Sequence, residues 1–124
     1  MNVNTEAGQL ETELVISFEI EGRHYWPNAP EEYAEFGHPH SHIFKVVCFF
    51  RTQKSDAPAR REQELFDLRR RCLQMVVGHF GRFNQPPCSF SDRSCEGIAD
   101  AIKQLVGASR VFVGEDWFFG AVVY

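Results

Sequence analysis

The sequence contains no apolar run that approaches the roughly 20 residues of a membrane-spanning helix. It also has no excess of positive charge, because 17 acidic residues outnumber 13 lysines and arginines and give a formal net charge of -4. Nucleic acids and anionic membranes are recognised through clustered cations, so we expect neither as a partner. The basic residues between Arg60 and Arg71 are interspersed with acids, and we interpret them as a solvated helix face.

A secretory signal and a cysteine framework are missing as well. Residues 1–13 are polar and acidic, without the basic start and the apolar stretch of a signal peptide. The four cysteines form no CxxC pair. We therefore expect a cytoplasmic protein with reduced thiols, and neither disulfides nor a four-cysteine zinc site.

The sequence does contain enough apolar material for one core. Of its 124 residues 44% are hydrophobic, and 12 of them are phenylalanine. No linker-like stretch divides the chain. This length and composition predict a single globular domain over residues 1–124.

Two segments alternate between apolar and polar residues, as a half-buried strand does. They span residues 13–26 and residues 40–51. Residues 27–37 between them hold two prolines and several acids, which predicts a loop. The apolar faces consist of Leu14, Ile16, Phe18 and Ile20 in the first segment and Phe44, Val46, Cys48 and Phe50 in the second.

Two helices and two short strands are predicted after these segments. Apolar residues recur at helical spacing over residues 60–77. A second helix begins near residues 92–94, where polar side chains can cap it, and stops at Gly107. A long glycine- and proline-rich loop joins the helices, and strands at 110–114 and 120–124 close the chain. The order β-β-α-α-β-β predicts an α+β fold, a four-stranded antiparallel sheet with both helices on one face.

Three histidines share the predicted apolar faces of the two long strands. His24 has the parity of the first apolar face, and His40 and His42 have the parity of the second. Two imidazoles at this spacing point the same way, and the third arrives from the neighbouring strand. Three neutral imidazoles that leave an open fourth position form the arrangement of a catalytic zinc ion.

Spacing alone leaves alternatives to this zinc site. The HPHSH segment also fits a polar turn with solvent-exposed imidazoles. A shifted register would make His38 and His40 the metal pair, although HSHIFKV favours His40 and His42. A cupin-like metal site would require a carboxylate three or four residues after His42, where this chain has Lys45 and Val46, so we set that class aside.

Four further stretches of the sequence form a recognisable set. They are HYWPNAPEEYAEFGHPHSHIFKV, EQELFDLRRR, RSCEGIADAI and VFVGEDWFFGAVVY. Together they resemble the motifs of the 6-pyruvoyl/6-carboxy-tetrahydropterin synthase family, in the family's order and over about 100 residues. The resemblance implies the tunnelling fold, with this β-β-α-α-β-β order.

The resemblance also implies a function. His24, His40 and His42 would hold zinc, which in the family polarises the side-chain hydroxyls of a dihydroneopterin-type substrate in a lyase or aldolase-like reaction. Glu115 matches the carboxylate that anchors the pterin ring. One carboxylate can accept two parallel N–H bonds from a 2-amino-pyrimidinone edge. Glu115 also fits a simple turn acid beside Asp116.

The chain departs from the family in its proton-transfer residues. The family's general base is a cysteine in the loop before the His-x-His motif, and the residue nearest that place here is Glu35. The family's Asp-His pair is represented only by His79, which follows Gly78. We expect Glu35 and His79 as the catalytic candidates, with Glu31 and Glu32 as rivals to Glu35. The alternative is a catalytically degenerate protein that binds zinc and a pterin- or purine-like ligand without turnover.

The resemblance implies self-assembly as well. Family members form trimers and hexamers with sites between subunits. An open four-stranded sheet exposes edges that pair with other chains. We therefore expect a homo-oligomer that binds a small pterin-like molecule.

Overall fold

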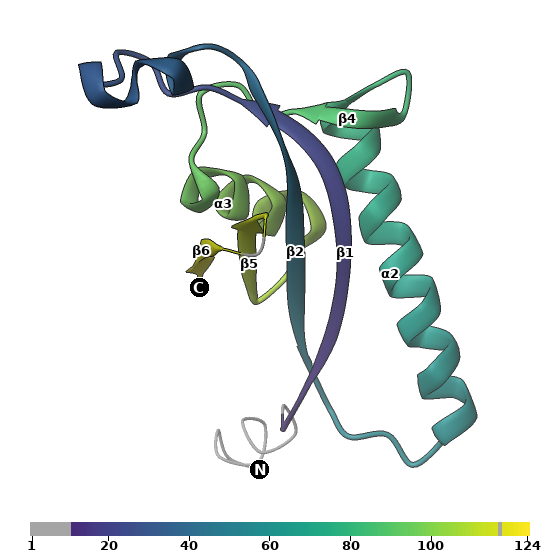
Figure 1. Ribbon diagram of the computed structural model, residues 1–124. Helices are drawn as coiled ribbons and strands as arrows, with labels where there is room; N and C mark the ends of the chain where they lie inside the picture. Colours follow the sequence, from purple (N-terminus) through teal and green to yellow (C-terminus); the bar gives the residue numbers. More distant parts are fainter. Residues whose placement is uncertain (1–10, 117) are drawn as a thin grey trace.

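The computed structural model describes residues 11–116 and 118–124, so the interpretation of residues 1–10 lies outside the described part of the chain. Two long curved strands, β1 and β2, run through the middle of the molecule (Figure 1). The elements in chain order are β1 (Thr12–His24), η1 (Glu31–Gly37), β2 (His40–Thr52), α2 (Pro58–Phe80), β3 (Gly81–Arg82), β4 (Gln85–Ser89), α3 (Cys95–Val106), β5 (Arg110–Glu115) and β6 (Phe119–Val123).

The sheet has six strands, in the order β3-β4-β1-β2-β5-β6, and not the predicted four. β1, β2, β5 and β6 pair antiparallel as expected, but β4 runs parallel to β1 and makes the sheet mixed. β3 and β4 lie in the stretch predicted as a loop. The sequence pattern did not predict these two strands, because Pro86 and Pro87 lack the N–H group that a central strand needs. β4 meets β1 only through Cys88 and Ser89, which follow the prolines.

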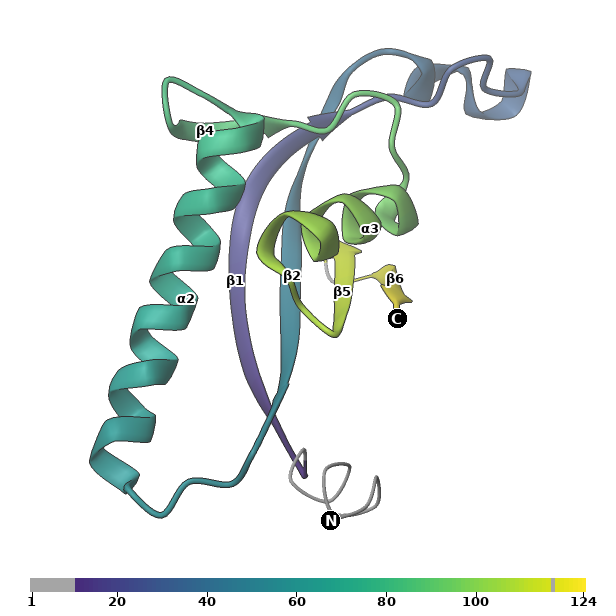
Figure 2. The same cartoon turned by 180° about the vertical axis from the view of Figure 1, so that it is seen from behind.

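The α+β class and the placement of both helices on one face are confirmed, because α2 and α3 contribute to one core against the same side of the sheet. Figure 2 shows this arrangement from behind. α2 is longer than predicted, with Pro58 in its first turn and its end at Phe80. The helix continues through Gly78 because one glycine costs only about 1 kcal/mol in a helix. No helix in the described residues is long and apolar enough to cross a membrane.

α3 begins and ends where the sequence predicted. The Ser94 hydroxyl accepts a hydrogen bond from the Gly97 N–H at 3.3 Å and so caps the first turn. Gly107 ends the helix in the left-handed region, at φ 76°. A residue with a side chain is strained there, which explains why glycine ends this helix.

The core consists of the predicted apolar strand faces and the buried stripes of the helices. Along β1, buried residues alternate with exposed ones from Ile16 to His24. The helices cover this face with Leu68, Cys72 and Val76 from α2 and with Ile98, Ala99 and Ile102 from α3. All four cysteines are buried free thiols, in agreement with the prediction of reduced cysteines.

The core ends in an aromatic floor that supports the histidines. Phe44 lies edge-on to His24 and His42, with ring centroids 5.2 and 5.8 Å apart. Phe90 packs against Phe44 at 5.2 Å. Gly22 leaves room for both rings, because a Cβ atom there would lie 2.5 Å from Phe90 and 2.8 Å from Phe44. Close aromatic packing therefore requires glycine at this position.

Candidate metal centre

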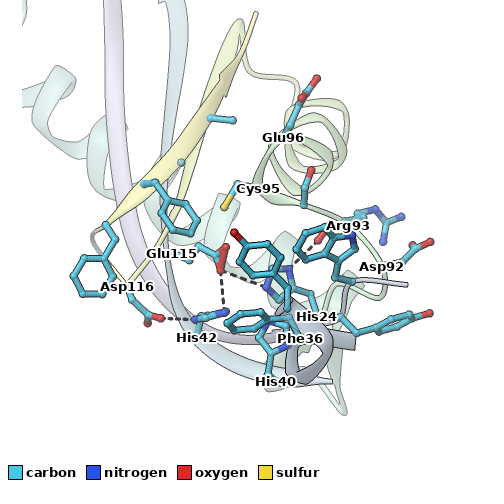
Figure 3. Close-up of a pocket in the computed structure, with 18 residues that line it drawn as sticks. His24, Phe36, His40, His42, Asp92, Arg93, Cys95, Glu96, Glu115 and Asp116 are labelled. Carbon is cyan, nitrogen blue, oxygen red and sulfur yellow. Dashed lines mark hydrogen bonds and ion pairs between the residues drawn. The ribbon is translucent and has the colours of Figure 1, made fainter. Parts of the chain in front are cut away.

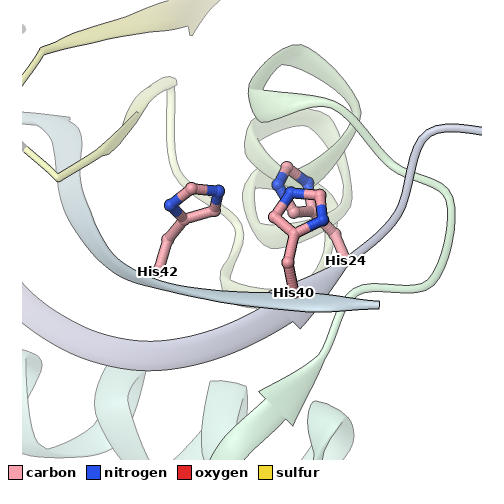
Figure 4. A group of neighbouring side chains, drawn as sticks. All are labelled: His24, His40 and His42. Carbon is pink, nitrogen blue, oxygen red and sulfur yellow. The ribbon is translucent and has the colours of Figure 1, made fainter. Parts of the chain in front are cut away.

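His24, His40 and His42 meet at one end of the β1–β2 pair, as the strand parity predicted (Figure 4). His24 lies directly opposite His40 in the register, and His42 lies two residues further along β2 on the same face. One ring nitrogen from each histidine lies within 4.8 Å of the other two, a spacing at which the three can hold a metal ion. His38 is outside this group, so the geometry favours the His40 and His42 register.

Each imidazole is oriented by a hydrogen bond from its Nδ1 atom. His24 Nδ1 bonds the carbonyl of Arg93 at 2.9 Å, and His40 Nδ1 bonds the carbonyl of His38 at 2.9 Å. His42 Nδ1 bonds the Asp116 carboxylate. A carbonyl or a carboxylate can only accept, so each Nδ1 carries a proton, and in the neutral imidazole the lone pair is on Nε2. This is the tautomer that a metal ion requires of a histidine ligand.

Asp116 is locked in place by the backbone of β2. Its N–H donates to the Ile43 carbonyl at 2.9 Å, and its Oδ1 accepts from the Ile43 N–H at 2.9 Å. Its other carboxylate oxygen receives the His42 Nδ1 proton. Asp116 lies at φ 49°, in a left-handed conformation that aspartate tolerates better than most residues. The conformation of the turn after β5 therefore fixes the Asp116 carboxylate in the position from which it orients the His42 ring.

Glu115 faces the Nε2 atoms of His24 and His42 (Figure 3). Its Oε2 lies 2.9 Å from His42 Nε2 and 3.3 Å from His24 Nε2. Glu115 is the last residue of β5 and pairs with Phe44 of β2, which places its side chain beside the histidines. Neither His24 Nε2 nor Glu115 Oε2 has an aligned hydrogen-bond partner, although both atoms are buried.

The charges in the site suit a cation. Burial alone would lower the pKa of His24, but Glu115 and the Arg93 carbonyl outweigh it and raise that pKa above its ordinary value. Burial alone would raise the pKa of Glu115, but the neighbouring imidazoles outweigh it and lower that pKa. The Ile43 N–H is the main cause of a lowered pKa at Asp116. Both carboxylates are therefore held in their charged form.

Zinc fits the residues present. The tautomers are those of metal-binding histidines, and His24 Nε2 is a buried polar atom that a cation would satisfy. A second carboxylate orients one ligand from behind, as in many zinc sites. These three histidines therefore form a possible metal site.

A pocket of about 830 Å³ opens over the three histidines. Aromatic side chains form much of its wall: Trp26 stacks on Tyr33 with centroids 5.4 Å apart, and Phe36 lies 5.4 Å from His40. The first turn of α3 borders the pocket with Cys95 and its neighbours. Such a cavity suits a planar heterocycle that stacks on the aromatic side chains of the wall and reaches the histidines and Glu115 with its polar edge.

The two predicted catalytic residues lie away from this pocket within one chain. Glu35 is exposed on η1, the seven-residue 3-10 segment that replaces part of the predicted loop, and it does not line the cavity. His79 lies in the last turn of α2, exposed and against Phe80 at 4.7 Å. Their catalytic roles stay predictions.

The sequence indicated the three histidines and Glu115 as candidates, but not two groups that contact them. Asp116 was noted only as the neighbour of Glu115, because a left-handed turn that directs its side chain back toward β2 leaves no periodic signal. The carbonyl of Arg93 was missed because any residue supplies a carbonyl. An acid directly after Glu115 was the one available sign of a second carboxylate.

No protein-family model and no curated protein matches this sequence. Among solved structures, 6-pyruvoyl tetrahydropterin synthase from Caenorhabditis elegans is similar, with a TM-score of 0.51. The alignment covers 90% of this chain and 94% of that chain, at 9% sequence identity. The chain has the tunnelling fold. An identity this low shows a relationship at the level of the fold, so the chemistry of the tunnelling-fold site must be argued from its own residues.

Proposed function

We propose that this chain is a zinc-dependent enzyme of the lyase or aldolase-like type that acts on a dihydroneopterin-type pterin. The observation that carries the proposal is the grouping of ring nitrogens from three histidines, all within 4.8 Å of one another, beside a large pocket lined by aromatic residues. The similarity to a tetrahydropterin synthase supports the same substrate class. A purely structural zinc site would not require a cavity of this size above it.

The side chains of the pocket can bind and orient such a substrate. Trp26, Tyr33 and Phe36 offer faces on which a pterin ring can stack. Glu115, held charged, can accept the paired N–H groups of the 2-amino-pyrimidinone edge. When bound, zinc supplies a Lewis acid that polarises a substrate oxygen. The position of Phe44 beneath His24 and His42 keeps bulk water from that side of the centre.

Proton transfer is assigned to Glu35 and His79. A carboxylate or an imidazole can act as general base when its environment brings its proton affinity into the working range. Both residues are exposed in the single chain, which is consistent with their completing a pocket only after assembly or loop movement. We propose that Glu35 takes the role of the loop cysteine and that His79 assists.

The proposal includes a homo-oligomer, a trimer or hexamer with the sites at subunit interfaces. Exposed aromatic residues occur at both edges of the sheet, with Phe83 between β3 and β4 and Phe119 on β6. These two residues are 84% and 66% exposed, and phenylalanine is enriched where proteins contact one another. Light scattering coupled to size exclusion tests this assembly, and a strictly monomeric chain would contradict it.

Zinc analysis and a turnover assay test the function. Protein purified without added metal should contain close to one zinc per chain, and dihydroneopterin or its triphosphate should be converted by it. Glu35→Gln should abolish turnover while zinc content is kept. Glu32→Gln, a change of a rival acid in the same segment, is the matched control and should leave turnover near the wild-type rate.

The alternative is a catalytically degenerate protein that binds zinc and a pterin- or purine-like ligand. The exposure of Glu35 outside the pocket favours it. In that case Glu115→Ala would abolish ligand binding, measured by calorimetry, while Glu35→Gln would change nothing. Product that forms with the wild type and disappears with Glu35→Gln would exclude this alternative.

A further inference from the structure

We infer that Glu115 is the fourth protein ligand of the metal in the ligand-free chain, so that the centre is a closed His3Glu site and not an open three-histidine site. The inference rests on the metal-binding part of the proposed function and is independent of the pterin. It changes the resting role of Glu115, which the resemblance assigns to the substrate alone.

The distances between the ligand atoms support this assignment. Two ligands about 2.0–2.1 Å from a zinc ion at a tetrahedral angle are about 3.3 Å apart. Glu115 Oε2 lies 3.3 Å from His24 Nε2 and 2.9 Å from His42 Nε2. These are close to the edges of a tetrahedron around one cation.

The hydrogen-bonding pattern points the same way. If Glu115 and the imidazoles formed a plain ion pair, a proton on Nε2 would aim at the carboxylate oxygen. Instead, Glu115 Oε2 and His24 Nε2 are both buried without an aligned hydrogen bond. The Nδ1 atoms of His24 and His42 already hold the donor role toward Arg93 and Asp116. A shared cation satisfies the buried nitrogen and the buried oxygen together.

Cys95 also lines the pocket and contacts Glu115. Glu115 is the residue whose carboxylate lies against the Nε2 atoms of two histidines, at 2.9 and 3.3 Å, and for this reason we assign the fourth position to it.

The consequence for ligand binding is an exchange at one carboxylate. A pterin whose amino-pyrimidinone edge takes both oxygens of Glu115 must release that side chain from the metal. The coordination position then opens only when the ring has arrived. The same residue would thus couple recognition of the ring to access of the substrate oxygen, and would keep small anions and water from the metal until then.

Zinc affinity and the spectrum of the cobalt-substituted protein test this inference. In competition with a chelating dye, Glu115→Gln should weaken zinc binding by more than the roughly 10–100-fold typical of outer-shell changes. Glu96→Gln removes an exposed pocket acid that does not face the histidines, and should change the affinity by less than about threefold. Equal affinities of the two variants would overturn the assignment.

The response of the spectrum to azide distinguishes coordination of the metal by Glu115 from a purely electrostatic effect of its charge. Added azide should leave the visible spectrum of the cobalt-loaded wild type unchanged, because Glu115 fills the position, and should alter that of Glu115→Gln. A wild-type spectrum that responds to azide would overturn the inference even if the zinc affinities of the variants differ. If Glu115→Gln does not fold, the azide response of the wild type is by itself the test. A wild type that binds no zinc at all defeats the proposed function as well, whereas zinc binding that needs His42 but not Glu115 defeats only the inference.

Discussion

The imidazole of His42 bonds through Nδ1 to the carboxylate of Asp116, on the side of the ring opposite the candidate metal position. The contact joins the start of β2 to the turn after β5, two segments 74 residues apart in sequence. A metal ligand held from behind loses less freedom when the ion binds, and its nitrogen is more basic.

Asp116→Gly should therefore weaken zinc binding by about 10–100-fold. Glycine removes the carboxylate without adding strain, because Asp116 lies at φ 49°. Asp116→Asn keeps one acceptor oxygen, which can serve the His42 Nδ1–H or the Ile43 N–H but not both, so it should weaken zinc binding less than Asp116→Gly does. Dye competition measures both constants. If both variants lost affinity equally, the hydrogen bond would not be the cause.

The three histidines should be individually necessary for the metal, and His38 should not. Elemental analysis of His24→Ala, His40→Ala and His42→Ala should find zinc strongly depleted, while His38→Ala keeps the wild-type content. In the wild type, zinc at 100 times its dissociation constant should add about 2.7 kcal/mol to the free energy of unfolding. Thermal unfolding with and without chelator measures that gain, and its persistence in His42→Ala would contradict the site.

The metal-free chain should be most stable in a mildly acidic window. His24 has a raised pKa in the folded protein, so its contribution is complete below the ordinary value of 6.5 and is lost as the pH rises through the raised pKa. Glu115 has a lowered pKa, so its contribution is complete above the ordinary value of 4.5 and is lost as the pH falls through the lowered pKa.

Urea unfolding in the presence of a chelator measures this profile from acid to mildly alkaline pH. Glu115→Gln removes the charge that raises the pKa of His24, and should flatten both sides of the curve. Glu96→Gln should leave the shape as it is. A wild-type profile with no decline above pH 6.5 would show that the pair does not contribute to folding.

Gly22→Ala should reduce both stability and metal affinity. The added methyl group would meet the rings of Phe90 and Phe44, which support the imidazoles, and Gly22 lies opposite His42 in the register. Overpacking of this kind costs about 1–3 kcal/mol. Gly37→Ala is the matched control, since its Cβ would lie 3.5 Å from the nearest atom, an ordinary contact. Chemical denaturation and dye competition report the two effects, and equal behaviour of the variants would refute the packing argument.

The parts of this molecule that follow from local periodicity could be predicted from sequence. Alternation put His24, His40 and His42 on the buried side, and Ser94 and Gly107 marked the ends of α3 because capping chemistry is local. β4 could not be predicted, since its pairing depends on a parallel contact with β1 across some 65 residues of chain and its prolines argue against a strand.

The geometry of the site shows the same division. Residue types and parity identify the imidazoles, but the direction of each ring depends on acceptors that no pattern encodes, such as the Arg93 carbonyl and Asp116. The position of Glu115 against the Nε2 atoms likewise depends on where β5 ends beside β2. These relationships arise only when strands distant in sequence are aligned.

The pairing of His24 with His40 closes a ladder whose two strands are each 13 residues long. A slip of one residue in this pairing would turn the histidines of the slipped strand outward, His24 on β1 or both His40 and His42 on β2, and would expose the apolar side of that strand to water. Chains with this mispairing would thus lose both the metal site and the buried apolar face. Metal uptake during folding would therefore report on the correct pairing of β1 with β2 along their full length.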